Sequence, residues 1–163
     1  MSFIQELANS ALKDDYMQKL IEKAEHIYGL NFLKKSINNL LSEKEYLDIM
    51  RFADILSRDI NYEGRNMAYK IISILYPFYK DDEYYKFICN SVMTKLGNFP
   101  SLGLIMEKDD AGRYDTPELL LDKQLKEVYQ KVPGTEKIFT DAQYRLFEAI
   151  KDSNHFSFSG PTS

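Results

Sequence analysis

The sequence predicts an all-α protein, either a helical bundle or a short array of stacked helical hairpins. Apolar residues recur at three- and four-residue intervals over most of the 163-residue chain, and the strict alternation of a half-buried strand is almost absent. A content of 44% hydrophobic and 28% charged residues is typical of a globular domain with a sizeable core. We therefore expect helices to dominate as far as residue 151.

Three helices are expected in the first part of the chain, over residues 2–12, 14–28 and 31–41. In each of them apolar side chains recur at helical spacing between polar ones. The pair Asp14-Asp15 lies at the start of the second segment, where acidic side chains favour the positive end of a helix. We interpret this pair as a helix start rather than as catalytic carboxylates.

The next two helices have defined boundaries in the sequence. Ser42 and Glu45 have the spacing at which each side chain can cap the other's backbone N–H group, which predicts a helix over 43–57. Its apolar face should comprise Tyr46, Ile49, Met50, Ala53 and Leu56. A second helix, over 63–76, should end before Pro77, because proline does not continue a helix comfortably. Its apolar face should comprise Met67, Ala68, Ile71, Ile72 and Leu75.

A further helix is expected over 81–96, because it opens with acidic residues and is followed by Gly97. The residues expected to be buried on it are Tyr84, Phe87, Ile88 and Leu96. Cys89, among apolar neighbours, should be a buried thiol rather than a reactive one. The similar pentads 45–49 and 83–87 have a separation that suits one hairpin of a stacked array, and a generic bundle is the alternative.

Residues 99–116 are expected to form a loop, because proline, glycine and aspartate are concentrated there. Thr116 and Pro117 then provide a helix cap followed by the residue favoured in a first helical turn. A helix should therefore run from this point to Lys131, before Pro133-Gly134 ends it.

Charge and composition exclude several classes of function. Lys and Arg number 21 against 25 Asp and Glu, so the net charge of −4 gives no overall positive field toward nucleic acid or an anionic membrane. A single cysteine and two distant histidines, His26 and His155, exclude an internal disulfide and a multi-cysteine metal site. We find no secretion signal and no run approaching the ~20 apolar residues of a membrane span. A cytoplasmic protein without a membrane partner is expected.

The carboxyl-terminal part carries the chemical information. A helix that begins near Thr140 is followed by a short predicted strand, 155–159, and by Gly160-Pro161-Thr162-Ser163. A phosphate-binding loop needs this order, since a strand delivers the chain to a glycine-rich turn whose N–H groups enclose phosphate oxygens. The sequence supplies the first glycine and three spacer residues of that motif. The lysine and the magnesium-binding hydroxyl that complete it are absent.

At these positions the sequence resembles superfamily 2 helicases of the DEAD/DEAH-box type. Gly160-Pro161-Thr162-Ser163, with Ser159, is similar to the opening of their motif I, and Phe139-Thr140-Asp141-Ala142-Gln143 is similar to their Q motif. The resemblance implies an adenine contact at Gln143, beside Thr140, and a phosphate contact at Gly160, Pro161, Thr162 and Ser163. A side-chain amide suits adenine, whose N6 donates and N7 accepts. Tyr129 is the nearest upstream aromatic residue that could stack on the base.

This resemblance implies a division of the chain into two parts. Residues 1–132 would be a helical N-terminal accessory domain, and residues 133–163 the truncated start of a RecA-like α/β motor domain. The parent protein would be an ATP-dependent helicase or translocase that uses ATP and Mg²⁺ and contacts nucleic acid through its motor. The fragment itself should be catalytically inactive and hold no cofactor. Its strand 155–159, without partner strands, should be extended, mobile or paired with another copy.

A second interpretation needs no nucleotide chemistry. Thr140 and Gln143 have the spacing of a capping box, so these residues are also explained by an ordinary helix start. Gly160-Pro161-Thr162-Ser163 is then a polar tail. Under this interpretation the chain is an all-helical adaptor module that binds a protein partner.

Overall fold

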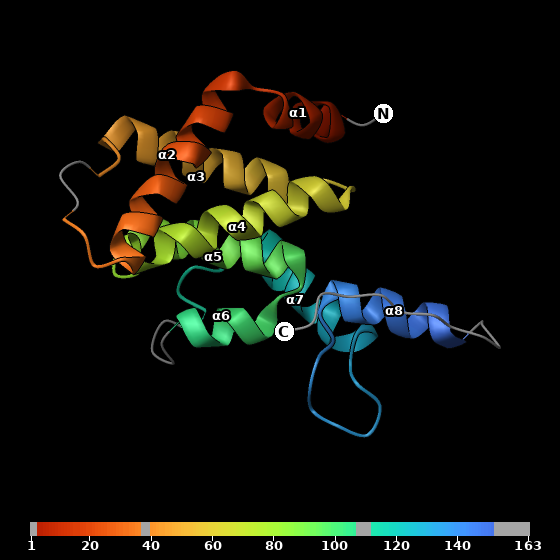
Figure 1. The fold of residues 1–163 in the computed structure, drawn as a ribbon. Coiled ribbons are helices and arrows are strands. Elements are labelled where there is room, and N and C mark those ends of the chain that lie inside the picture. The colour runs from red at the N-terminus through yellow and green to blue at the C-terminus, as the bar shows by residue number, and fades with distance from the viewer. Residues whose placement is uncertain (1–2, 37–39, 107–111, 152–163) are drawn as a thin grey trace.

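The structure is a computed structural model that describes residues 3–36, 40–106 and 112–151. Within these ranges the chain forms eight helices and no β-strand, which confirms the predicted all-α class (Figure 1). The helices are α1 (Phe3–Leu12), α2 (Asp15–Phe32), α3 (Glu43–Ser57), α4 (Tyr62–Tyr79), α5 (Glu83–Leu96), α6 (Phe99–Ile105), α7 (Pro117–Tyr129) and α8 (Asp141–Lys151). An isolated antiparallel bridge joins Lys131 to Ile138 between α7 and α8.

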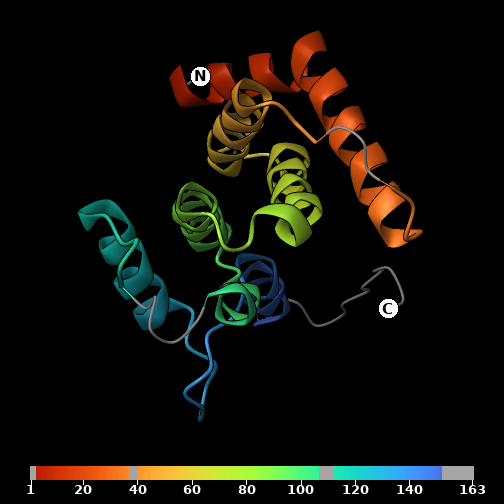
Figure 2. The same ribbon diagram turned by 90° about the vertical axis from the view of Figure 1, so that its left-hand side faces the viewer.

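Helices α1 to α5 are arranged in two adjacent layers. Helix α3 packs against α1 on one side and α5 on the other, while α2 packs against α4. Figure 2 shows α1, α3 and α5 one below the other, with α2 and α4 beside them. Each of the helices α1 to α5 therefore contacts a helix two places away along the chain as well as its hairpin partner, as in stacked helical hairpins.

The core lies between α2, α3, α4 and α5. Every residue predicted for the apolar face of 43–57 is buried, and so are those of 63–76 except Met67, which is partly buried. The Tyr85 hydroxyl group donates a hydrogen bond to the Ile72 carbonyl oxygen at 2.8 Å, which joins α5 to α4 inside this core. Cys89 is buried, as expected, and burial raises the pKa of its thiol to about 12.

Helix caps account for most of the boundaries. The reciprocal Ser42–Glu45 capping box is present at the start of α3, and Thr116 caps α7 in front of Pro117. The acidic segment before α5 also has a capping role, because Asp82 Oδ1 accepts the Tyr85 N–H at 2.8 Å. The same oxygen accepts the Tyr46 hydroxyl group of α3 at 2.5 Å.

One predicted helix and two predicted helix ends were wrong. The helix expected over 14–28 continues to Phe32 as α2 and is followed by Lys34 at a φ of 52°. The separate helix expected over 31–41 is not formed, since residues 33–36 and 40–41 are not helical. Helix α4 continues through Pro77 to Tyr79. Pro77 lies in the last turn and on the exposed surface. Its missing N–H group costs the helix only one backbone hydrogen bond. The residues after Pro77 are also held by packing, since the Tyr79 ring stacks on the Tyr46 ring of α3 with centroids 4.2 Å apart.

Two further expectations differ from the structure. Part of the predicted loop 99–116 is helix α6, since Asn98 caps the Ser101 N–H and a proline in the first helical turn has no N–H bond to lose. On α5 the fully buried aromatic residue is Tyr85, whereas Tyr84 is partly buried and Phe87 is exposed. The similar pentads 45–49 and 83–87 align Tyr84 with the buried Tyr46 of α3. Because the buried residue is Tyr85, the buried face of α5 is shifted by one residue relative to that alignment.

The position of the core predicts very different losses in the free energy of unfolding when two leucines are truncated. Leu56 of α3 is fully buried, whereas Leu104 of α6 is 84% exposed. Leu56→Ala should lower the free energy of unfolding by about 2–5 kcal/mol, through lost burial and a residual cavity. Leu104→Ala, the matched control, should change it by less than about 0.5 kcal/mol. Urea unfolding followed by circular dichroism measures both, and equal losses would contradict the position of the core.

Candidate functional site

The candidate site lies at the start of α8, where a short loop returns the chain from α7. The loop is closed by backbone hydrogen bonds from Val132 N to Lys137 O and from Phe139 N to Gln130 O, both 2.8 Å long. Gly134, at a φ of 74°, allows the turn between them. This geometry delivers Phe139, Thr140 and Asp141 next to the end of α7.

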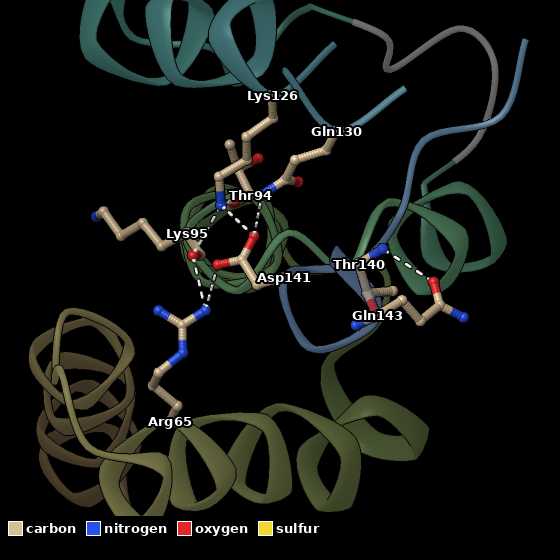
Figure 3. Close-up of polar contacts among 8 residues, drawn as sticks. All are labelled: Arg65, Thr94, Lys95, Lys126, Gln130, Thr140, Asp141 and Gln143. Atoms are coloured by element: carbon tan, nitrogen blue, oxygen red, sulfur yellow. Dashed lines mark hydrogen bonds and ion pairs between the residues drawn. The ribbon is translucent and has the colours of Figure 1, made fainter. Parts of the chain in front are cut away.

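Thr140 and Gln143 cap the start of α8 reciprocally. The Thr140 N–H donates to Gln143 Oε1 at 2.9 Å, and the Gln143 N–H donates to Thr140 Oγ1 at 3.2 Å (Figure 3). The capping box predicted from their spacing is therefore present. Gln143 remains exposed, and its Nε2 group has no hydrogen-bond partner among the described residues.

Asp141, between these two residues, joins α8 to α4, to α7 and to the residue that follows α7. Its Oδ2 atom accepts a hydrogen bond from Arg65 of α4 at 2.6 Å. Its Oδ1 atom accepts from Lys126 Nζ of α7 at 3.0 Å and from Gln130 Nε2 at 3.1 Å. Figure 3 shows the carboxyl group between Arg65 on one side and Lys126 and Gln130 on the other, at the end of α5. Asp141 thus carries the polar contacts that hold α8 to other helices of the described chain.

The two cations also cap the C-terminus of α5. Lys126 Nζ donates to the carbonyl oxygens of Thr94 and Lys95 at 2.9 and 3.0 Å, and Arg65 donates to the Lys95 oxygen at 3.2 Å. Cations are favourable at the negative end of a helix, and an acidic side chain is favourable at the positive start of α8. The Asp141 carboxylate and the C-terminal carbonyl groups of α5 are therefore bound by the same two cations, Arg65 and Lys126.

The pKa of Asp141 reflects this balance. Burial by itself would raise the pKa of the carboxyl group, because it disfavours the charged form. Lys126, the hydrogen bond from Gln130 and Arg65 outweigh burial, so the pKa lies below its usual value. The carboxylate is consequently ionised throughout the neutral range.

Gly97 allows α5 and α8 to approach this closely. It ends α5 in the left-handed conformation, at a φ of 66°, as the predicted helix stop required. A Cβ atom at this position would overlap the carboxyl group of Asp141. Glycine is therefore needed at residue 97 both for backbone conformation and for space.

A groove of about 600 Å³ lies beside Gln143. Its lining residues come from the start of α6, the returning loop and α8: Phe99, Pro100, Val132, Glu136, Lys137, Ile138, Phe139 and Gln143. The groove combines aromatic rings with one side-chain amide, the residue types that suit a planar heterocycle with donor and acceptor edges. Tyr129, the aromatic residue proposed from the sequence, does not line it.

The predicted site residues divide into two sets. Thr140 and Gln143 are adjacent at the α8 start. Gly160, Pro161, Thr162 and Ser163, together with the predicted strand 155–159, lie outside the described residues. Sequence reasoning missed Phe99 because its segment was assigned to a loop. It also gave Asp141 no role, although an acidic residue just after a helix cap is a recognisable signal for a charge at a helix N-terminus.

The described residues contain no group of three or more His, Cys, Asp and Glu side chains arranged to hold a metal ion. None of the helices in the described ranges combines the length and the apolar character that a bilayer crossing requires. No protein-family model, curated protein or solved structure matches this chain.

The close contact at Gly97 predicts opposite effects for two glycine substitutions. Gly97→Ala should destabilise the protein by about 1–3 kcal/mol, because alanine is strained at positive φ and its Cβ displaces Asp141. Gly29→Ala, in the helical backbone of α2 with open space around its Cβ position, should stabilise it by about 0.5–1 kcal/mol. Urea unfolding measures both. A neutral Gly97→Ala variant would show that α5 and α8 are not in contact in solution.

The Asp141 contacts predict a change in the pH dependence of stability. A carboxyl group whose pKa is lowered on folding stabilises the protein above about pH 4, and this contribution is lost as pH falls through the lower folded value. Asp141→Asn should therefore be less stable than the parent chain by about 1–3 kcal/mol at pH 7, with a smaller difference at pH 3. Asp122→Asn, on α7 and without an ion pair among the described residues, is the control. The same difference at both pH values would contradict the ion-pair assignment.

Proposed function

We propose that this chain is the N-terminal accessory or regulatory part of an ATP-dependent nucleic-acid helicase or translocase. Residues 1–132 would form the accessory domain, and residues 133–163 would begin the motor domain. The observation that carries the proposal is the Q-motif-like segment 139–143, which precedes the phosphate-loop-like residues 160–163 in the sequence. The geometry at the start of α8 is compatible with this function.

The side chain of Gln143 meets the chemical requirements of an adenine contact. Its carbonyl oxygen has two lone pairs, and the Thr140 N–H uses one of them. The second lone pair can accept the N6–H group of adenine, and Nε2 can donate to N7. The capping box and the adenine contact therefore do not exclude each other.

The neighbouring groove supports the same proposal. Phe99 and Phe139 contribute aromatic rings to its lining, and a base gains about 1–3 kcal/mol from stacking on an aromatic side chain. In the proposed site Gln143 holds the adenine edge, Thr140 fixes the Gln143 amide, and one of these rings covers the base. Gly160, Pro161, Thr162 and Ser163 would contribute to holding the phosphates. ATP bound there would supply the free energy of hydrolysis that moves the parent's motor lobes along a strand.

In this proposal residues 1–163 do not by themselves catalyse ATP hydrolysis. The sequence lacks the lysine that would neutralise phosphate charge and the hydroxyl that would hold Mg²⁺. The parent would provide both, with the Asp-Glu box and the second lobe. Its cofactors would be ATP and Mg²⁺, and its partner a nucleic acid bound by the motor.

The decisive experiment tests the adenine contact in the parent protein. Gln143→Glu keeps the size of the side chain but replaces the Nε2 donor to N7 with an acceptor, so kcat/KM for ATP should fall about tenfold. Gln124→Glu, on the exposed surface of α7, should leave kcat/KM unchanged. Purified 1–163 should show no ATP turnover above buffer. An unaltered kcat/KM in the Gln143 variant, or a gene that encodes no Gly-Lys-Ser or Gly-Lys-Thr just after Ser163, would refute the proposal.

A further inference from the structure

The outward surface of α7 has an unusual composition for a helix in contact with solvent. Helix α7 packs against α5, and Leu119 is its one buried residue. Five large apolar side chains on it are exposed: Leu120, Leu121, Leu125, Val128 and Tyr129. Val128 and Tyr129 are the most open of these, at 74% and 68%. Exposed apolar residues scattered singly are ordinary, whereas a group on one helix of 13 residues indicates a contact surface.

Three of these side chains form a stripe. Leu121, Leu125 and Val128 have the i, i+4, i+7 spacing that places residues along one side of a helix. Tyr129 lies beside the stripe at the C-terminal end. This spacing is the anchor pattern by which an amphipathic helix binds an apolar groove or another helix. We call these four residues, with Leu120, the α7 face.

The positive charges of α7 are turned away from this face. Lys123 Nζ donates to Asp115 Oδ1 at 2.5 Å and to Asn90 Oδ1 at 3.1 Å. Lys126 Nζ donates to Asp141 and to the carbonyl oxygens at the end of α5. Both lysines of α7 are therefore engaged in hydrogen bonds and ion pairs with residues outside α7.

The charges that remain beside the α7 face are negative. Asp122 and Glu127 have no cationic partner among the described residues, and at 100° per residue they fall on opposite sides of the stripe. The net charge of the chain, −4, has the same sign. An apolar stripe between two uncompensated carboxylates favours a partner of opposite charge, because a like-charged rim would be repelled.

We propose that the α7 face binds a protein partner through an amphipathic helix whose apolar stripe is flanked by lysine or arginine. The apolar residues of the two stripes supply the binding energy, and Asp122 and Glu127 select the basic partner and speed its approach. This interaction gives the helical part of the chain an adaptor role. It is independent of the nucleotide site proposed at Gln143, and either can fail without the other.

The test measures binding of two synthetic amphipathic peptides of equal length to residues 1–163. One carries leucine with lysine and the other leucine with glutamate at the same positions. The Leu/Lys peptide should bind, with an affinity that falls as salt is added, and the Leu/Glu peptide should not. The double variant Leu125→Ser/Val128→Ser should weaken Leu/Lys binding about tenfold or more. Leu104→Ser removes a leucine of α6 that is even more exposed, and should have no effect.

A second pair of variants separates the local charges from the net charge. Asp122→Lys/Glu127→Lys should reduce binding of the Leu/Lys peptide about tenfold. The control Glu22→Lys/Glu43→Lys changes the net charge equally at exposed positions of α2 and α3, and should leave the affinity within about twofold. Equal losses in both variants would overturn the proposal, as would equal binding of both peptides or of neither. A dimer of the unmodified chain that Leu125→Ser/Val128→Ser converts to monomer would instead assign the α7 face to a second copy.

Discussion

The carboxylate of Asp141 determines how α8 is attached to the other helices. One side chain receives hydrogen bonds from α4 and α7 and from the residue that follows α7, and it lies against the glycine that ends α5. Helix α8 has no buried residue, so apolar packing contributes little to holding it. The placement of α8, and with it Gln143, therefore depends on a few charge-assisted hydrogen bonds that tolerate little change in geometry.

This attachment depends on contacts that are distant in the sequence. Local signals predicted the parts: the Ser42–Glu45 box, the Thr116 cap, the stop at Gly97 and the Thr140–Gln143 pair each need only neighbouring residues. Arg65 and Lys126 resemble other surface cations until the fold brings them to one end of α5. A pattern of three to four residues contains no information about contacts between residues far apart in the sequence. The ion pairs of Arg65 and Lys126 with Asp141 could therefore not have been predicted.

The other differences have local causes. Pro77 and the proline and glycine residues after Gly97 predicted irregular backbone, but a proline in the first or last turn of a helix loses few hydrogen bonds. The run from Tyr84 to Ile88 contains apolar side chains on more than one side of α5. Periodicity alone was therefore compatible with two different buried faces for this helix. Packing selected Tyr85, whose hydroxyl group reaches the Ile72 carbonyl oxygen. Tertiary contacts therefore corrected the register where the composition was ambiguous.

The two hydrogen bonds accepted by Asp82 Oδ1 have a consequence for cooperativity. One oxygen atom holds both the first turn of α5 and a side chain of α3, and the Tyr46 ring that it anchors stacks on α4. Fraying of α5 at this end would release contacts to both neighbours, so we expect the three central helices to open as one unit. Helix α8 shares none of these contacts, and we expect its opening to be a separate, less costly fluctuation. That opening would take Asp141 away from Arg65 and Lys126, the two cations that cap the other end of α5.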